Sequence, residues 1–295
     1  MSSIQIIPCP YDSGRKHWRC GNGPTAILEQ GAVQELQNMG ASVEVFEIEP
    51  QLHYESENSM GFEIQRRIAA AVEAAAAAGK LPLVIAGNCN TAVGGISGIG
   101  GGHKRGHLWF DAHGDFCTPE TTDSGFLDGM GLAMLVGRCW QQALSHMPGY
   151  EAVAETSTAL IGARDLDPLE TRDLEDSEVS LIRVETIRNS GVDAALGPFL
   201  DNLEPIVDRL YIHVDLDVLD PVETPANQLN VPNGLWVDEV CDAIRLAGSK
   251  CHIVGAGLGS YDPSVDPGGN TARAAIKILQ TLFAVHRDFI DHEGM

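Results

Sequence analysis

The chain has few basic residues and no hydrophobic run long enough to cross a membrane. Lysine and arginine together number 19, against 41 aspartates and glutamates, and the formal net charge of the 295 residues is −22. Such an excess of acid argues against nucleic acid and anionic membranes as partners. The alanine-rich run 69–78 is interrupted by Glu73 and indicates a soluble helix rather than a membrane span. We therefore expect a partner that is a small molecule.

We expect neither a secretory signal nor a disulfide framework in this chain. Its first residues contain neither a basic segment nor a long apolar one. Its seven cysteines are an odd number and are scattered without regular spacing, which suits a reducing compartment. These absences predict a cytoplasmic protein.

No linker, low-complexity tract or internal repeat divides the sequence, so we predict a single domain over residues 1–295. Hydrophobic residues make up 44% of the chain, which is sufficient for a full core. Short apolar segments alternate with longer helical patterns, which predicts an α/β fold: a three-layer α/β/α arrangement around a central, mainly parallel sheet. The expected strands are 4–7, 43–48, 83–86, 108–110, 159–162, 179–184, 210–214 and 252–255. The expected helices are 25–39, 61–78, 132–144, 192–203, 237–246 and 271–289.

Two acidic motifs, 111–115 (Asp-Ala-His-Gly-Asp) and 213–217 (His-Val-Asp-Leu-Asp), each follow a predicted buried strand. In an extended chain, residues two apart point to the same face, and open α/β sheets place their sites beyond the carboxyl ends of the strands. Neither motif contains a lysine or arginine, and buried charges must be paired or bind metal. The alternative is a set of solvated acids in turns at the strand ends. We predict a centre for two divalent ions, with Asp111, His113, Asp115, Asp215 and Asp217 as ligands.

These motifs, in this order and at this separation, resemble the DAHxD and SxDxDxxDP signatures of the arginase/agmatinase (ureohydrolase) superfamily. The likeness extends over most of the chain: Asp220-Pro221 completes the second signature, Gly23-Pro24-Thr25 resembles an early EGPxxLR segment, and Thr224-Pro225-Ala226 matches a TPA stretch. The family's fold is the three-layer arrangement expected above. The resemblance implies a metal-dependent hydrolase of a C–N bond in a guanidino compound.

The resemblance also implies a role for each ligand. Asp111 and Asp215 would bridge two Mn²⁺ ions, Asp115 would bind one ion, and His113 with Asp217 would bind the other. Water activated between the ions would attack the guanidinium carbon, and oxygen and imidazole donors suit Mn²⁺.

Three positions depart from the arginase pattern. In Ala86-Gly87-Asn88-Cys89-Asn90, which aligns with a GGDHS turn, Cys89 occupies the place of a histidine ligand. A thiolate can bind metal and would favour Zn²⁺ or Fe²⁺ on its side of the centre; the alternatives are an inert core cysteine beside an incomplete site, or Asn90 as a weaker substitute.

The second departure is Asp128, at the place of the histidine that shuttles protons in arginases. As a catalytic residue it would shuttle protons if its pKa is raised, or pair with a cationic substrate; the alternative is that it caps the next helix. The third is Ser260, where arginases carry a glutamate that grips the guanidinium.

One arginase feature is retained. The segment 161–170 (Ile-Gly-Ala-Arg-Asp-Leu-Asp-Pro-Leu-Glu) resembles a loop in which Asp167 would read the α-amino group of an amino-acid substrate. The alternative is a turn acid paired with Arg164. The substrate-binding candidates are therefore Cys117, Ser124, Asp167, Glu170 and Ser260.

This combination is most similar to the Nω-hydroxy-L-arginine amidinohydrolase branch known from D-cycloserine biosynthesis, an antibiotic pathway, and implies hydrolysis to ornithine and hydroxyurea. An arginase variant acting on L-arginine is the first alternative. A formimidoylglutamase or guanidino-acid hydrolase is the second, and would need Arg15, Lys16 or Arg19 for a distal carboxylate. A silent binding protein of the same fold and a mononuclear zinc deacylase rank lower. Family members are often trimers or hexamers, so a homo-oligomer is a further expectation.

Overall fold

The computed structural model describes residues 3–100 and 104–293. Its centre is an eight-stranded sheet in the order β4-β1-β5-β10-β9-β6-β7-β8, and every neighbouring pair is parallel. This confirms the predicted α/β class. The strands are β1 (Ser3–Cys9), β4 (Ser42–Val45), β5 (Lys80–Ala86), β6 (Arg105–Phe110), β7 (Thr158–Ile161), β8 (Ser180–Ile182), β9 (Arg209–Asp215) and β10 (Ile253–Gly259).

Alternate strand residues enter two separate hydrophobic cores, one on each face of the sheet. On β6, Leu108 and Phe110 belong to one core and Trp109 to the other. On β9, Ile212 lies in the first core and Tyr211 in the second. Because strand side chains alternate between faces, nearly continuous apolar strands produce a sheet that is covered on both sides.

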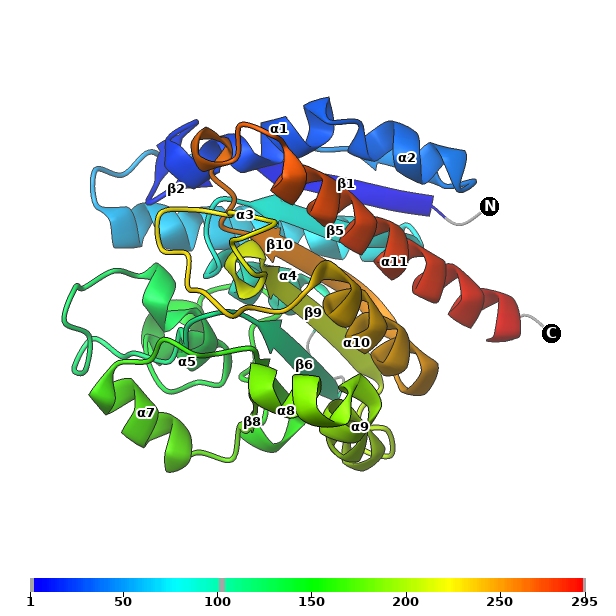
Figure 1. The fold of residues 1–295 in the computed structure, drawn as a ribbon. Coiled ribbons are helices and arrows are strands. Elements are labelled where there is room, and N and C mark those ends of the chain that lie inside the picture. Colours follow the sequence, from blue (N-terminus) through cyan, green and yellow to red (C-terminus); the bar gives the residue numbers. More distant parts are fainter. Residues whose placement is uncertain (1–2, 101–103, 294–295) are drawn as a thin grey trace.

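Helices cover both faces (Figure 1). The first core contains residues from α1 (Gly23–Glu29), α2 (Ala32–Asn38), α8 (Val184–Ser190), α9 (Val192–Leu203), α10 (Val237–Lys250) and α11 (Asn270–Glu293). The second contains residues from α3 (Glu57–Ala77), α4 (Thr91–Gly98), α5 (Gly131–Leu135), α6 (Gln141–Leu144) and α7 (Pro168–Glu175). Among the described residues, no helix combines the length and hydrophobicity needed to span a bilayer.

Two predicted helices are each divided in the structure. The predicted helix 25–39 is α1 and α2, separated at Gly31, whose φ is +106°. The predicted helix 132–144 is α5 and α6, separated by Gly137 with φ +82° and Trp140 with φ +55°. A left-handed residue ends a helix, and glycine adopts that conformation without a steric penalty.

Helix α4 was not predicted, because its sequence contains three glycines and glycine is a poor helix former. The glycines allow close packing against α3. A Cβ on Gly94 would lie 2.4 Å from the backbone oxygen of Gln65, and one on Gly98 would lie 2.4 Å from that of Ala69. Tertiary packing therefore overrides local propensity here. Helices α7 and α8 were also missed.

The acidic motifs converge for a different reason than the sequence suggested. β6 ends at Phe110, so residues 111–115 form a loop rather than an alternating strand, and Asp115 has φ +48°. Asp217 lies in the 3₁₀ turn η4 (Leu216–Val218). The motifs meet because β6 and β9 are neighbours in register, with Phe110 opposite Val214.

Candidate metal centre

The predicted site residues gather where four neighbouring strands end. In sheet order these strands are β5, β10, β9 and β6. The turn after β5 supplies Cys89, and Ser260 directly follows β10. The end of β9 supplies Asp215 and Asp217, and the loop after β6 supplies Asp111, His113 and Asp115. The carboxyl edge of a parallel sheet is where α/β proteins place their sites, and this fold follows that rule.

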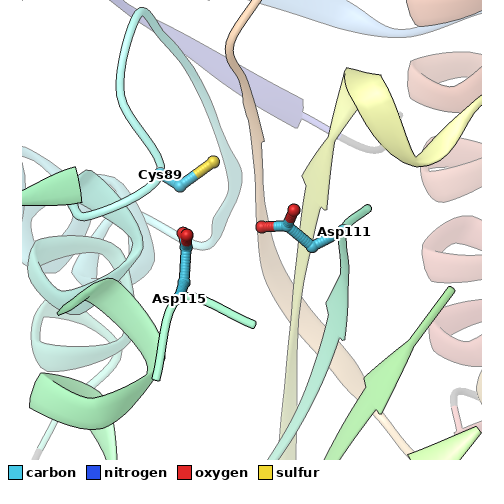
Figure 2. A group of neighbouring side chains, drawn as sticks. All are labelled: Cys89, Asp111 and Asp115. Carbon is cyan, nitrogen blue, oxygen red and sulfur yellow. The ribbon is translucent and has the colours of Figure 1, made fainter. Parts of the chain in front are cut away.

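Two groups of ligand-type atoms share one carboxylate. In the first, which we call the Cys89 group, ligand-type atoms of Cys89, Asp111 and Asp115 lie within 4.8 Å of one another. In the second, the His113 group, the same holds for Asp111, His113 and Asp217. Figure 2 shows the side chains of the Cys89 group turned toward a common space. Asp111 belongs to both groups, the arrangement expected of a carboxylate between two ions.

Asp215 contacts both Cys89 and Asp217. Its Oδ2 accepts a hydrogen bond from the Cys89 Sγ at 2.7 Å, and its Oδ1 accepts one from the Asp217 backbone N–H at 2.7 Å. The structure thus brings all six predicted metal ligands together.

Asp111 and Asp217 are oriented by hydrogen-bond donors. The Asp111 Oδ2 accepts from the Trp109 Nε1 at 2.9 Å, and its Oδ1 accepts from the His113 backbone N–H at 2.7 Å. Asp217 accepts from the Asn227 Nδ2 at 3.1 Å and from the Ala112 backbone N–H at 3.3 Å. Partners that fix ligand orientation are a general feature of metal sites.

The centre carries more negative charge than its protein neighbours compensate. Burial, followed by repulsion from neighbouring carboxylates, raises the pKa of Asp115 and of Asp215 well above the usual range. Burial would lower the pKa of His113, but Asp111 and Asp217 raise it to about 10. Burial and the surrounding carboxylates also raise the pKa of the Cys89 thiol.

The nearby Arg164 does not neutralise this charge. Its guanidinium donates to backbone oxygens, including those of Val231 at 2.8 Å and Asp217 at 2.9 Å. Apart from His113, whose Nδ1 lies 3.4 Å from carboxylate oxygens of both Asp111 and Asp217, the described structure pairs none of these carboxylates with a cationic side chain. Four buried carboxylates, one imidazole and one thiol form a donor set that fits divalent cations.

Asp128 is tied to the turn that carries Cys89. Its Oδ1 accepts hydrogen bonds from the backbone N–H of Asn90 at 2.7 Å and from the Asn90 Nδ2 at 3.0 Å, and its Oδ2 accepts from the Asn88 Nδ2 at 2.8 Å. Burial raises the pKa of Asp128 to about 7, against the opposing effect of these donors. Asp128 forms no helix cap, so the alternative capping role is wrong. The sequence had offered Asn90 as a substitute ligand, but its side-chain amide is engaged elsewhere: Nδ2 donates to Asp128, and Oδ1 accepts from the Gln65 Nε2 at 3.1 Å.

Ser260, at another of the departures from the arginase pattern, touches Cys89. The two side chains meet with Sγ and Oγ 3.1 Å apart. Ser260 has φ +63°, and its backbone oxygen accepts from the Asn227 Nδ2 at 2.9 Å. Asp128, Cys89 and Ser260 are therefore connected by direct contacts or through the two asparagines that flank Cys89.

A single pocket contains the predicted substrate residues and opens onto the centre. It is lined by His113, Asp115, Asp128, Asp215 and Asp217 and by all five substrate candidates, Cys117, Ser124, Asp167, Glu170 and Ser260. Among the described residues that line it, Arg19 is the only lysine or arginine, and its Nε lies 3.8 Å from the Asp12 Oδ2. The pocket is strongly acidic and therefore suits a cationic molecule.

Glu170 supports the loop that carries Asp115. It accepts from the Phe116 backbone N–H at 2.9 Å and from the Asp167 backbone N–H at 3.3 Å. A Cβ on Gly114 would lie 2.4 Å from the Glu170 carboxyl group, so the glycine allows this contact. Asp167 is exposed at the start of α7. The alternative pairing of Asp167 with Arg164 is wrong, because the arginine binds backbone oxygens instead.

Sequence reasoning missed the residues that orient the ligands. Trp109 was read only as a strand residue, and Asn88 and Asn227 were assigned no role. Trp109 lies two positions before Asp111 and has an N–H donor, and this spacing on one strand could have predicted that it orients the carboxylate. The contacts of Asn88 and Asn227 join segments 40 and 10 residues away and have no local signal.

Comparisons with known proteins decide the family. The model of the arginase family matches residues 2–284. The chain belongs to the arginase family. It is 28% identical to an arginase of Bacillus caldovelox, over 96% of this chain and 98% of the relative. The crystal structure of an arginase from Bacillus subtilis has a TM-score of 0.85 at 28% identity, covering 95% of this chain and 98% of that one.

A formimidoylglutamase of Bacillus subtilis has the same fold, with a TM-score of 0.77 at 19% identity. As a member of the arginase family, the chain is a metal-dependent amidinohydrolase of guanidino compounds.

Proposed function

We propose that this protein hydrolyses Nω-hydroxy-L-arginine to L-ornithine and hydroxyurea at a centre of two Mn²⁺ ions. Water adds to the guanidino carbon, the bond from that carbon to the ornithine side-chain nitrogen breaks, and this nitrogen receives a proton. The oxygen of water and the N–OH group leave together in hydroxyurea. The reaction needs no co-reactant other than water.

The contact between Ser260 and Cys89 is the observation that favours Nω-hydroxy-L-arginine over L-arginine as the substrate. Where arginases place a carboxylate against the guanidinium, this chain has a serine hydroxyl 3.1 Å from a buried thiol. An N-hydroxyguanidine is less basic than a guanidinium and does not depend on a carboxylate to hold a full positive charge. Its oxygen would also offer a metal-loaded centre a donor atom that arginine lacks.

Two further acids in the pocket lining suit the head group of an amino acid. Asp167 and Asp165 are exposed acids that line the pocket, and Glu170 fixes the loop between the pocket and the centre. A carboxylate at Asp167 can accept hydrogen bonds from an α-ammonium group, and such charge-assisted bonds are strong and directional. Cys117 and Ser124, on the loop after β6, border the remainder of the substrate.

In the proposed centre six residues would hold the metals: Cys89 and Asp115 on one side, His113 and Asp217 on the other, and Asp111 and Asp215 between them. When bound, two divalent ions supply a water nucleophile at neutral pH and stabilise negative charge in the transition state. The carboxylates would bind Mn²⁺ readily, whereas the Cys89 thiolate favours Zn²⁺ or Fe²⁺ on its side.

L-Arginine is the second candidate substrate, because the ligands and the α-amino-binding loop are retained. Formimidoylglutamate is less well supported. Lys16 binds Glu47 and Glu49 away from the pocket, and Arg15 stacks on Trp18 outside it. Only Arg19 remains to bind a distal carboxylate, and Asp12 already lies beside it.

We also infer that the protein works in a reducing, cytoplasmic environment. All seven cysteines lie within the described residues, and all are buried and free. A thiol that must bind metal in its reduced form is consistent with that compartment.

The test is to measure hydrolysis of L-arginine and Nω-hydroxy-L-arginine by the Mn²⁺-loaded protein, with hydroxyurea and urea separated by chromatography and bound metal assayed in parallel. We expect turnover of the hydroxylated substrate to exceed that of arginine by roughly 100-fold or more, the discrimination expected when a polar group has a dedicated partner. Equal turnover would make this an arginase variant, and a metal-free inactive protein would favour a silent binding protein.

The α-amino contact has a matched pair of variants. Asp167→Asn should raise KM for the hydroxylated substrate more than Asp165→Asn does, because both acids are exposed in the pocket but only Asp167 is assigned to the head group. Equal effects would remove Asp167 from that role.

A further inference from the structure

The three residues Asn88, Cys89 and Asn90 and the carboxylate of Asp128 form one buried unit. The two asparagines flank the cysteine, and both bind the same carboxylate from opposite sides. All four residues are buried. Asn88 and Asn90 are also held from outside, because the Asn88 Oδ1 accepts from the Ser13 backbone N–H at 2.8 Å and the Asn90 Oδ1 accepts from the Gln65 Nε2 at 3.1 Å.

Both carboxylate oxygens of Asp128 are occupied by these amide donors. Two donors on Oδ1 and one on Oδ2 hold the carboxyl plane against the turn and leave little freedom for the side chain to swing toward a leaving group. Charge-assisted bonds of this kind are stronger than neutral ones, and when buried they lock a conformation. A proton shuttle has the opposite requirement, because it must exchange partners during turnover.

We propose that Asp128 is a positioning residue: through Asn88 and Asn90 it fixes the turn that aims the Cys89 sulfur into the metal centre. This replaces the proton-shuttling role that the sequence suggested for the same position. It rests on the proposed function in one respect, namely that Cys89 is a metal ligand. The GGDHS turn that this segment resembles has an aspartate at the position of Asn88. In this chain the carboxylate at the turn comes instead from Asp128, which binds the turn from a separate segment.

The hydrogen bonds from Asn88 and Asn90 to Asp128, which we call the Asp128 clamp, compensate for the use of a cysteine in the place of a histidine ligand. A cysteine is shorter than a histidine, so its backbone must approach the metal more closely and be held there. The packing around the turn is correspondingly tight. A Cβ on Gly259 would lie 3.2 Å from the Cys89 Sγ, and one on Gly87 would lie 2.3 Å from the Tyr11 backbone oxygen. Once the turn is fixed, Asp215 and Ser260 contact the sulfur from the other side.

The experiment uses the full-length protein loaded with Co²⁺, in which a thiolate ligand produces a sulfur-to-cobalt charge-transfer absorption in the near ultraviolet. Wild type should show the band, and Cys89→Ser should lack it. Asp128→Ala removes all three hydrogen bonds, so we expect it to lose most of the band and about one of its two metal equivalents. Asp128→Asn retains an oxygen for both Asn90 donors and loses only the Asn88 bond, so most of the band should remain.

Asp165→Asn is the control for the loss of one pocket carboxylate, because it contacts neither asparagine and should leave the band unchanged. Should Asp128→Ala fail to fold, Asn88→Ala removes the hydrogen bond between Asn88 and Asp128 from the asparagine side and should also weaken the band. Metal retained by the His113 group reports that the remaining fold is intact.

Failure of this proposal is distinguishable from failure of the proposed function. No charge-transfer band in wild type would show that Cys89 is not a ligand, and both statements would fall. A wild-type band that persists at full strength in Asp128→Ala and Asn88→Ala, with both metals bound, would overturn the positioning role alone. If turnover were then lost equally in Asp128→Ala and Asp128→Asn, Asp128 would be the proton shuttle.

Discussion

The two halves of the centre are built differently although they share Asp111. The His113 group contains only ligands that match the resembling motifs, and they are oriented by Trp109, Asn227 and backbone donors. The Cys89 group contains Cys89 itself, the cysteine at the place of a histidine ligand. The other two positions that depart from the arginase pattern contact it: the Ser260 Oγ lies beside the sulfur, and Asp128 accepts a hydrogen bond from the Asn90 backbone N–H in the same turn. The comparison shows that the three departures form one connected change on one side of the centre rather than three independent losses.

The largest effect should come from the residue that the two halves share. Asp111→Asn weakens both metal sites, because it removes charge from the carboxylate between them. Loss of an orienting partner alone typically costs 10–100-fold in affinity or activity, so we expect activity to fall by more than about 100-fold and both metals to be depleted. Metal analysis and kcat/KM measure this. Asp123→Asn, an exposed acid outside the pocket, is the control. A variant that loses only one metal would show that Asp111 does not serve both halves.

Metal removal should expose the uncompensated charge of the centre. Each filled site contributes about 2.7 kcal/mol when free metal is at 100 times its Kd, so saturating both sites should raise the Tm by roughly 10 °C. In Cys89→Ser the same addition of Mn²⁺ should give about half that shift. Thermal unfolding with and without a chelator measures both values. Identical shifts in wild type and Cys89→Ser would mean that the cysteine half binds no metal.

The smallest expected effect comes from an orienting donor. Trp109→Phe leaves Asp111 without its 2.9 Å indole partner and should weaken metal binding by about 10–100-fold in both halves. Phe110→Leu is the matched control: the neighbouring aromatic is equally buried but belongs to the core on the opposite face of the sheet. It should lower stability without changing metal affinity. Equal metal loss in both variants would attribute the effect to packing rather than to the donor.

The sequence predicted the sheet, its two helical layers and the six clustered metal candidates, because strand periodicity and the two acidic motifs are local patterns. It failed where the cause is a contact between distant segments. The breaks at Gly31 and Gly137 depend on backbone conformation, and α4 depends on close packing against α3. The role of Asp128 depends on amide groups 38 and 40 residues away in the chain. A motif locates a residue at a site, but it does not show which neighbours occupy that residue's hydrogen-bonding atoms.

The most direct test of the two-half account is anomalous diffraction at the manganese edge from Mn²⁺-soaked crystals of wild type and of Cys89→Ser. The account predicts two peaks in wild type, one in each group, and in Cys89→Ser a single strong peak among Asp111, His113 and Asp217. Two peaks of unchanged strength in the variant would contradict it, because the sulfur would then contribute nothing to the centre.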